Sequence, residues 1–129
     1  AATRAPRLVH EPDANPEITA EVTRAMAAIN PAGYAQAVRM LASGDLAGTL
    51  AEMRVPTGFL LGAEDRITPE AQTRQAAGAV ARATGTPPPV EIIPGAGHAV
   101  YLQRPAAFAA ALARVTDILS QSAPHRRTA

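Results

Sequence analysis

Two short glycine-containing loops of the chain carry side chains that can hold or transfer a proton. Glu64 and Asp65 follow an apolar run that ends at Gly62, and His98 follows a Gly-Ala-Gly turn. A carboxylate that accepts a hydrogen bond from a histidine ring fixes the tautomer of that ring and makes it a better base. The sequence therefore predicts an acid–histidine pair for general-base chemistry, with Asp65 and Glu64 as the two candidate acids.

Each of these residues also has a purely structural interpretation. A loop histidine such as His98 often caps a turn or binds a carbonyl group, and a loop aspartate such as Asp65 often closes an Asx-turn. His10 and His125 lie in polar terminal segments and belong to no constellation of chemical groups. With no pair of histidines at helical spacing and no nearby carboxylate cluster, the sequence does not indicate a metal site.

The elements that must position Asp65 and His98 are two short strands. The run from Val55 to Gly62 and the segment 90–93 are apolar and bounded by proline and glycine, which is typical of buried strands. A helix is expected to begin at Thr68-Pro69-Glu70 and end near Gly85, between the two strands. This order predicts a parallel pair with a crossover helix, whose carboxyl ends share one edge. Ligands bind beyond that edge in open parallel sheets, so the acid and the histidine are expected to meet there.

Helices flank this unit on both sides in the sequence. Asn15-Pro16 and Asn30-Pro31 predict two helix starts with asparagine N-caps, and the second helix is expected to end at a left-handed Gly44. Asp45 is expected to cap a third, short helix. The last helix opens at Arg104-Pro105, and an apolar stripe predicts its inward face: Phe108, Leu112, Val115 and Leu119.

The composition limits what the chain does. Of its 129 residues, 31 are alanine, which favours helix but buries little area, so the core is expected to be thin. The basic residues are 12 arginines, scattered along the chain, and the net charge is +1, which argues against a nucleic-acid partner. No apolar run is long enough to span a bilayer. Because residues 1–10 lack the apolar stretch of a signal peptide, a cytoplasmic location is expected.

Taken together, several motifs resemble the C-terminal part of an α/β-hydrolase. They are the Val-Pro-started strand ending in Gly-Ala-Glu-Asp, the loop Pro-Gly-Ala-Gly-His, and the Arg-Pro start of a phenylalanine-bearing helix. The resemblance covers residues 51–119 as core strands and helices, whereas residues 1–50 are similar to the end of a lid and a connecting helix. Residues 120–129 are expected to form a flexible tail. The segment from Asn-Pro-Ala-Gly-Tyr at 30–34 to Asp-Leu at 45–46 is most similar to 3-oxoadipate enol-lactonases and their carbon–carbon hydrolase relatives.

The resemblance implies catalytic roles for Asp65 as the triad acid and His98 as the triad base. It also implies cofactor-free hydrolysis of a small carbonyl substrate such as an ester or a lactone. The nucleophile of this family is a serine in a Gly-x-Ser-x-Gly elbow. Ser43, Ser120 and Ser122 are the serines of this chain, and none lies in such an elbow. The nucleophile is therefore expected from outside the chain, on a missing N-terminal half, and the chain is expected to be a C-terminal portion that can form oligomers.

Two alternatives remain at this stage. Dehalogenases and epoxide hydrolases of the same fold use an aspartate nucleophile, which would also lie outside this chain, because fold does not fix function. A non-catalytic hydrolase-like module that binds or assembles with another protein is the second alternative. A Gly-x-Ser-x-Gly elbow in an upstream segment or a partner chain would favour the enzyme.

Overall fold

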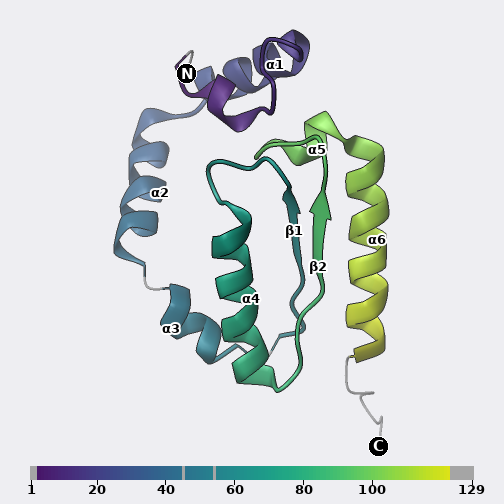
Figure 1. The fold of residues 1–129 in the computed structure, drawn as a ribbon. Helices are drawn as coiled ribbons and strands as arrows, with labels where there is room; N and C mark the ends of the chain where they lie inside the picture. The colour runs from purple at the N-terminus through teal and green to yellow at the C-terminus, as the bar shows by residue number, and fades with distance from the viewer. Residues whose placement is uncertain (1–2, 45, 54, 123–129) are drawn as a thin grey trace, which may run out of the picture.

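A computed structural model describes residues 3–44, 46–53 and 55–122 of the chain (Figure 1). It is a mixed α/β arrangement, consistent with a partial α/β-hydrolase fold. The elements in chain order are a 3-10 helix η1 (Ala5–Leu8), α1 (Pro16–Ala27), α2 (Pro31–Ser43), α3 (Leu46–Ala51), β1 (Phe59–Gly62), α4 (Glu70–Thr84), β2 (Val90–Ile93), α5 (Val100–Gln103) and α6 (Pro105–Ser122). Asp45 and the tail residues 123–129, including His125, lie outside the described residues.

The two strands pair in parallel, as the sequence predicts, and their ends are level. The register pairs Phe59 with Val90 and Gly62 with Ile93. The first strand is shorter than the apolar run from Val55 suggests, because the pairing begins where the Phe59 N–H donates to the Pro89 carbonyl. The residues before Val90 are prolines, which have no N–H to extend the ladder backwards.

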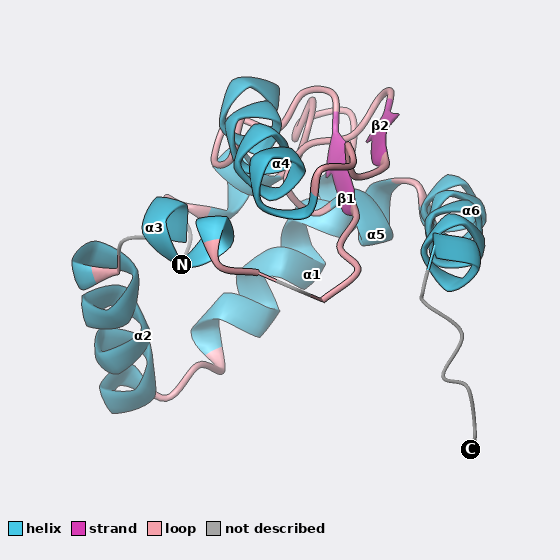
Figure 2. Ribbon diagram, turned by 90° about the horizontal axis from the view of Figure 1, so that it is seen from below, coloured by secondary structure: helices cyan, strands magenta, loops and turns pink. Residues whose placement is uncertain are grey.

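Helices α4 and α6 lie on opposite sides of the strand pair (Figures 1 and 2). Val80 of α4 is 2 % exposed and Val115 of α6 is 3 % exposed, so each helix buries a valine in the centre of the fold. Helix α4 ends at Gly85, whose φ of 74° provides a left-handed cap. The crossover helix between the strands therefore ends close to the position that the sequence predicts.

The inward face of α6 differs from the predicted stripe at one position. Leu112 is 46 % exposed, whereas its neighbour Ala111 is fully buried and packs with Ile93, Ala96 and Val100. The small side chain of Ala111 therefore packs against the end of β2, and Leu112, one position further along the helix, is left largely exposed to solvent. Helix α6 also continues to Ser122, beyond the predicted end of its apolar stripe.

The N-terminal segment lies across the carboxyl ends of the strands, at the top of Figure 1. Helix α2 then runs down beside the rest of the fold, and α3 packs against α4.

The Asn30 side chain caps α2 as predicted, because its oxygen accepts hydrogen bonds from the N–H groups of residues 32 and 33. Gly44 is not left-handed; its φ is −80° and its conformation is extended. The Asn15 side chain does not cap α1 but donates to the carbonyl groups of His10 and Glu11.

The core is thin, as the high alanine content predicts. Buried residues form two small clusters, one under the N-terminal segment around Val9 and Val22, and one between β2 and α6 around Ile93. Most of α2 stays exposed, including the apolar side chains of Tyr34, Val38 and Leu41. Within the described residues, the helices are too short or too polar to cross a bilayer.

Candidate active site at the strand ends

The loops that follow β1 and β2 continue side by side beyond the sheet. The Ala63 N–H donates to the Ile93 carbonyl at 2.9 Å, and the Glu64 N–H donates to the Ala96 carbonyl at 3.0 Å. This approach requires a glycine at the end of β1, because a Cβ on Gly62 would overlap the carbonyl oxygens of Ala96 and Gly97. The level strand ends and this close contact bring Asp65 and His98 to the same place.

The carboxylate of Asp65 lies at the centre of the site and is fully hydrogen-bonded. Its Oδ1 accepts from the backbone N–H groups of Ile67 at 2.8 Å and Thr68 at 3.0 Å. Its Oδ2 accepts from the Thr68 hydroxyl at 2.8 Å and lies 2.9 Å from Nδ1 of His98. A carboxylate offers about four acceptor sites, and these four contacts use all of them. The backbone bonds to Oδ1 form the Asx-turn that the sequence allowed, and Oδ2 of the same carboxylate contacts the histidine.

The histidine is oriented by this carboxylate and remains open to solvent. Side-chain exposure is 4 % for Asp65 and 41 % for His98. Because an ionised carboxylate only accepts hydrogen bonds, Nδ1 of His98 must carry the proton in their contact, and Nε2 of the neutral ring then has a free lone pair. A ring held in this tautomer can accept a proton at Nε2 from a group that approaches from outside.

The surroundings of Asp65 keep its carboxyl group ionised. Burial raises its pKa, but the hydrogen bonds from His98, Thr68 and Ile67 outweigh burial and hold the pKa below its ordinary value. The negative charge beside Nδ1 is therefore present at neutral pH. Such a charge stabilises the imidazolium that forms when the ring accepts a proton.

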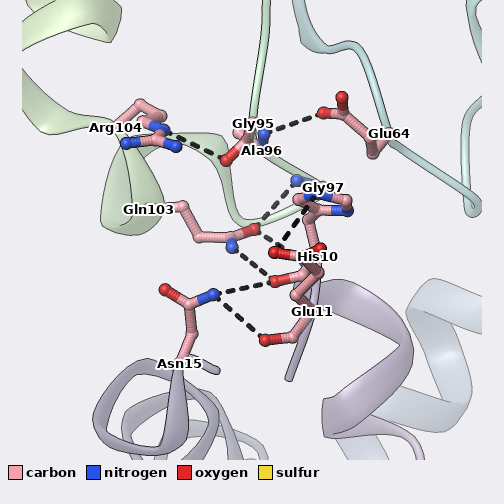
Figure 3. Close-up of polar contacts among 9 residues, drawn as sticks. All are labelled: His10, Glu11, Asn15, Glu64, Gly95, Ala96, Gly97, Gln103 and Arg104. Carbon is pink, nitrogen blue, oxygen red and sulfur yellow. Dashed lines mark hydrogen bonds and ion pairs between the residues drawn. The ribbon is translucent and has the colours of Figure 1, made fainter. Parts of the chain in front are cut away.

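Glu64, the competing acid, has a different task. Its Oε2 accepts the Ala96 N–H at 2.9 Å, which holds the turn before the histidine (Figure 3). Asp65 is thus the residue whose carboxylate meets the His98 ring.

Sequence reasoning missed Thr68, which was expected only to begin a helix; its hydroxyl donates to Asp65 and lies 3.3 Å from Nδ1 of His98. Its spacing of three from an Asx-turn aspartate is the signal that could have found it.

The serines and the second described histidine do not join the pair. The hydroxyl groups of Ser43, Ser120 and Ser122 each bond to a backbone carbonyl in their own helix, on exposed positions. His10 was expected to lie in an isolated terminal segment, but its backbone N–H and carbonyl contact Gln103 beside the turn that precedes His98. Among the described residues, no group of three or more acidic or histidine side chains is arranged to hold a metal ion.

These features define a parallel strand pair that presents an aspartate–histidine pair at its carboxyl edge. The model of the alpha/beta hydrolase family matches residues 1–111, which is most of the chain. The chain belongs to the alpha/beta hydrolase family. No curated protein and no solved structure matches the chain significantly.

Proposed function

We propose that this chain supplies the acid and the base of the catalytic triad of a cofactor-independent hydrolase. The observation that carries the proposal is the 2.9 Å contact between Oδ2 of Asp65 and Nδ1 of His98. It leaves Nε2 of a solvent-exposed ring available to a reacting group. Membership of the alpha/beta hydrolase family supports the same chemistry.

The attacking serine in this proposal comes from outside the 129 residues, from a further segment of the polypeptide or a second chain. Serine hydroxyl is a weak nucleophile until a base takes its proton. His98 accepts that proton at Nε2 while the serine attacks the carbonyl carbon, and then returns it to the leaving group, which leaves the acyl group on the serine. Water then gives a proton to the same nitrogen as it attacks this acyl group, and the proton returns to the serine oxygen when the acid product leaves. Asp65 holds the ring and balances its positive charge during these transfers. The proposed substrate is a small ester, lactone or related carbonyl compound.

The test is turnover of an aryl ester by the complete enzyme, with this chain in wild-type form and as His98→Ala. We expect His98→Ala to lose several orders of magnitude in kcat and to retain substrate binding, because the serine loses its base. Turnover of the wild type should also fall at acid pH, since a protonated ring cannot accept a proton. The chain alone should not hydrolyse the ester.

His10→Ala is the matched control in this assay. His10 contacts the neighbouring loop through its backbone N–H and carbonyl, and alanine keeps both groups. Its activity should remain close to that of the wild type. Turnover that survives His98→Ala would place the base elsewhere, and an assembled enzyme without any turnover would favour a non-catalytic binding module.

A further inference from the structure

Each residue of the turn before His98 is held by a different side chain (Figure 3). The Nε of Arg104 donates to the Gly95 carbonyl at 3.1 Å, and Glu64 accepts the Ala96 N–H at 2.9 Å. The third contact comes from Gln103, whose Oε1 accepts the Gly97 N–H at 2.8 Å. The position of the His98 backbone therefore depends on side chains that do not touch the Asp65–His98 pair.

Gln103 differs from the other two because it also binds a distant segment of the chain. Its Oε1 accepts the His10 N–H at 2.9 Å, and its Nε2 donates to the His10 carbonyl at 2.9 Å. One half-buried amide thus forms hydrogen bonds with the peptide groups of two separate segments, at His10, which lies 93 positions earlier in the sequence, and at Gly97, which lies six positions earlier. An amide suits this position because it is both an acceptor and a donor.

A second set of contacts shows that this junction is tightly packed. The Ala99 N–H donates to the Leu8 carbonyl at 2.9 Å, so the N-terminal segment contacts the loop on both sides of His98. A Cβ on Gly97 would lie 2.9 Å from the His10 nitrogen and 3.1 Å from the Leu8 oxygen. Both neighbours are backbone atoms, which yield less easily than flexible side chains. The segment 8–10 and the loop 97–99 therefore form one joined unit.

We infer that Gln103 is a positioning residue for His98. It joins the segment 8–10 to the loop that carries the histidine, and so keeps Nδ1 of His98 on the carboxylate of Asp65. The inference rests on the proposed function for its effect on turnover, because Gln103 itself touches neither the pair nor a reacting atom. Without its amide, the N–H groups of Gly97 and His10 lose their acceptor and the loop gains freedom to move.

The first experiment follows this loop by NMR in the 129-residue chain, as wild type and as Gln103→Ala. Amide exchange at Gly97 and His10 should become about tenfold faster, as expected from loss of one ordinary hydrogen bond. The Nδ1–H signal of His98 should broaden or disappear. Gln75→Ala, which alters an exposed glutamine on α4, should leave all three signals unchanged.

Gln103→Glu separates positioning from simple loss of folding. A glutamate keeps an acceptor for the N–H groups of Gly97 and His10 but, once ionised, places a negative oxygen against the His10 carbonyl in place of a donor, and this repulsion pushes the segment 8–10 away. Exchange protection of His10, corrected for intrinsic exchange, should therefore decrease as the new carboxyl group ionises, while the wild type shows no such step. This variant also provides the test if Gln103→Ala does not fold.

In the complete enzyme, Gln103→Ala should lower kcat about tenfold or more and change KM little, because the base is misplaced and the substrate contacts remain. An unchanged His98 Nδ1–H signal in both Gln103 variants would overturn the inference, whatever the activity. The His98→Ala assay decides the proposed function separately, because it does not depend on the NMR signals of the loop.

Discussion

Replacing Asp65 by asparagine removes its negative charge and turns one of its two acceptor atoms into a donor. Asparagine has the same shape, and its amide oxygen can take the place of Oδ1 and keep the N–H bonds of Ile67 and Thr68. Its NH₂ group then takes the place of Oδ2, where it meets the Nδ1 atom of His98. Because an NH₂ group donates, the ring must accept at Nδ1 and carry its proton at Nε2. That tautomer has no lone pair at Nε2 for the attacking serine.

Two magnitudes follow from these contacts. The two backbone bonds to Oδ1 lose their charge assistance and the Thr68 hydroxyl loses its acceptor Oδ2, at about 1 kcal/mol each, so the free energy of unfolding should fall by about 3 kcal/mol. The ring of His98 keeps a hydrogen bond, because its Nδ1 accepts from the new NH₂ group, and the ring is 41 % exposed, so the change at His98 adds little to this loss. The wrong tautomer has a larger effect on turnover, about 10⁴-fold in kcat by analogy with other triads.

The assay combines urea unfolding of the chain, kcat of the complete enzyme, and NMR of the His98 ring nitrogens. Asp117→Asn is the matched control, because Asp117 is an exposed aspartate on α6, away from the pair. It should alter none of the three measurements. A ring that keeps its proton on Nδ1 in Asp65→Asn, or a kcat within about tenfold of the wild type, would refute the role given to the Asp65 charge.

Two more predictions concern stability and the close packing of the loops. Hydrogen bonds outweigh burial and lower the pKa of Asp65, so its stabilising effect should be complete above the ordinary aspartate pKa and should decrease as pH falls through the lowered value. Urea midpoints across this acid range should converge for the wild type and Asp65→Asn; a constant difference would contradict the sign. Gly62→Ala should displace the loop that contains Gly97, because the new methyl group overlaps backbone oxygens, and kcat should fall together with thermal stability. Gly33→Ala is its control, since a methyl group there meets no atom within 4 Å.

The meeting of Asp65 and His98 was predictable because it depends on topology. Two short apolar segments separated by a helical segment favour parallel strands, and parallel strands end at the same edge. The register that pairs Gly62 with Ile93 makes those ends level. Once this is known, residues three and five positions further along need only short loops to reach each other.

The contacts that hold the loops were not predictable in the same way. The hydrogen bonds between His10 and Gln103 join residues 93 positions apart, and on the His10 side they use the backbone N–H and carbonyl, which do not distinguish His10 from most other residues. No periodicity or motif marks such a contact in a single sequence. The orientation of Leu112 was missed for a related reason: helical spacing gives the apolar side of α6, but the close approach at Ala111 decides which residue faces β2.

In the proposed catalytic triad, orienting the base and supplying the nucleophile are two separate requirements. Among the residues that the structure describes, the hydrogen bonds to the carboxylate of Asp65 come from Ile67, Thr68 and His98, all within this chain. Orientation of the base therefore needs no group from the nucleophile's side, and the ring presents Nε2 to solvent while its other nitrogen is held. A serine brought to Nε2 by another segment would meet a base whose tautomer and counter-charge are already set. This preorganisation removes part of the reorganisation that would otherwise accompany proton transfer.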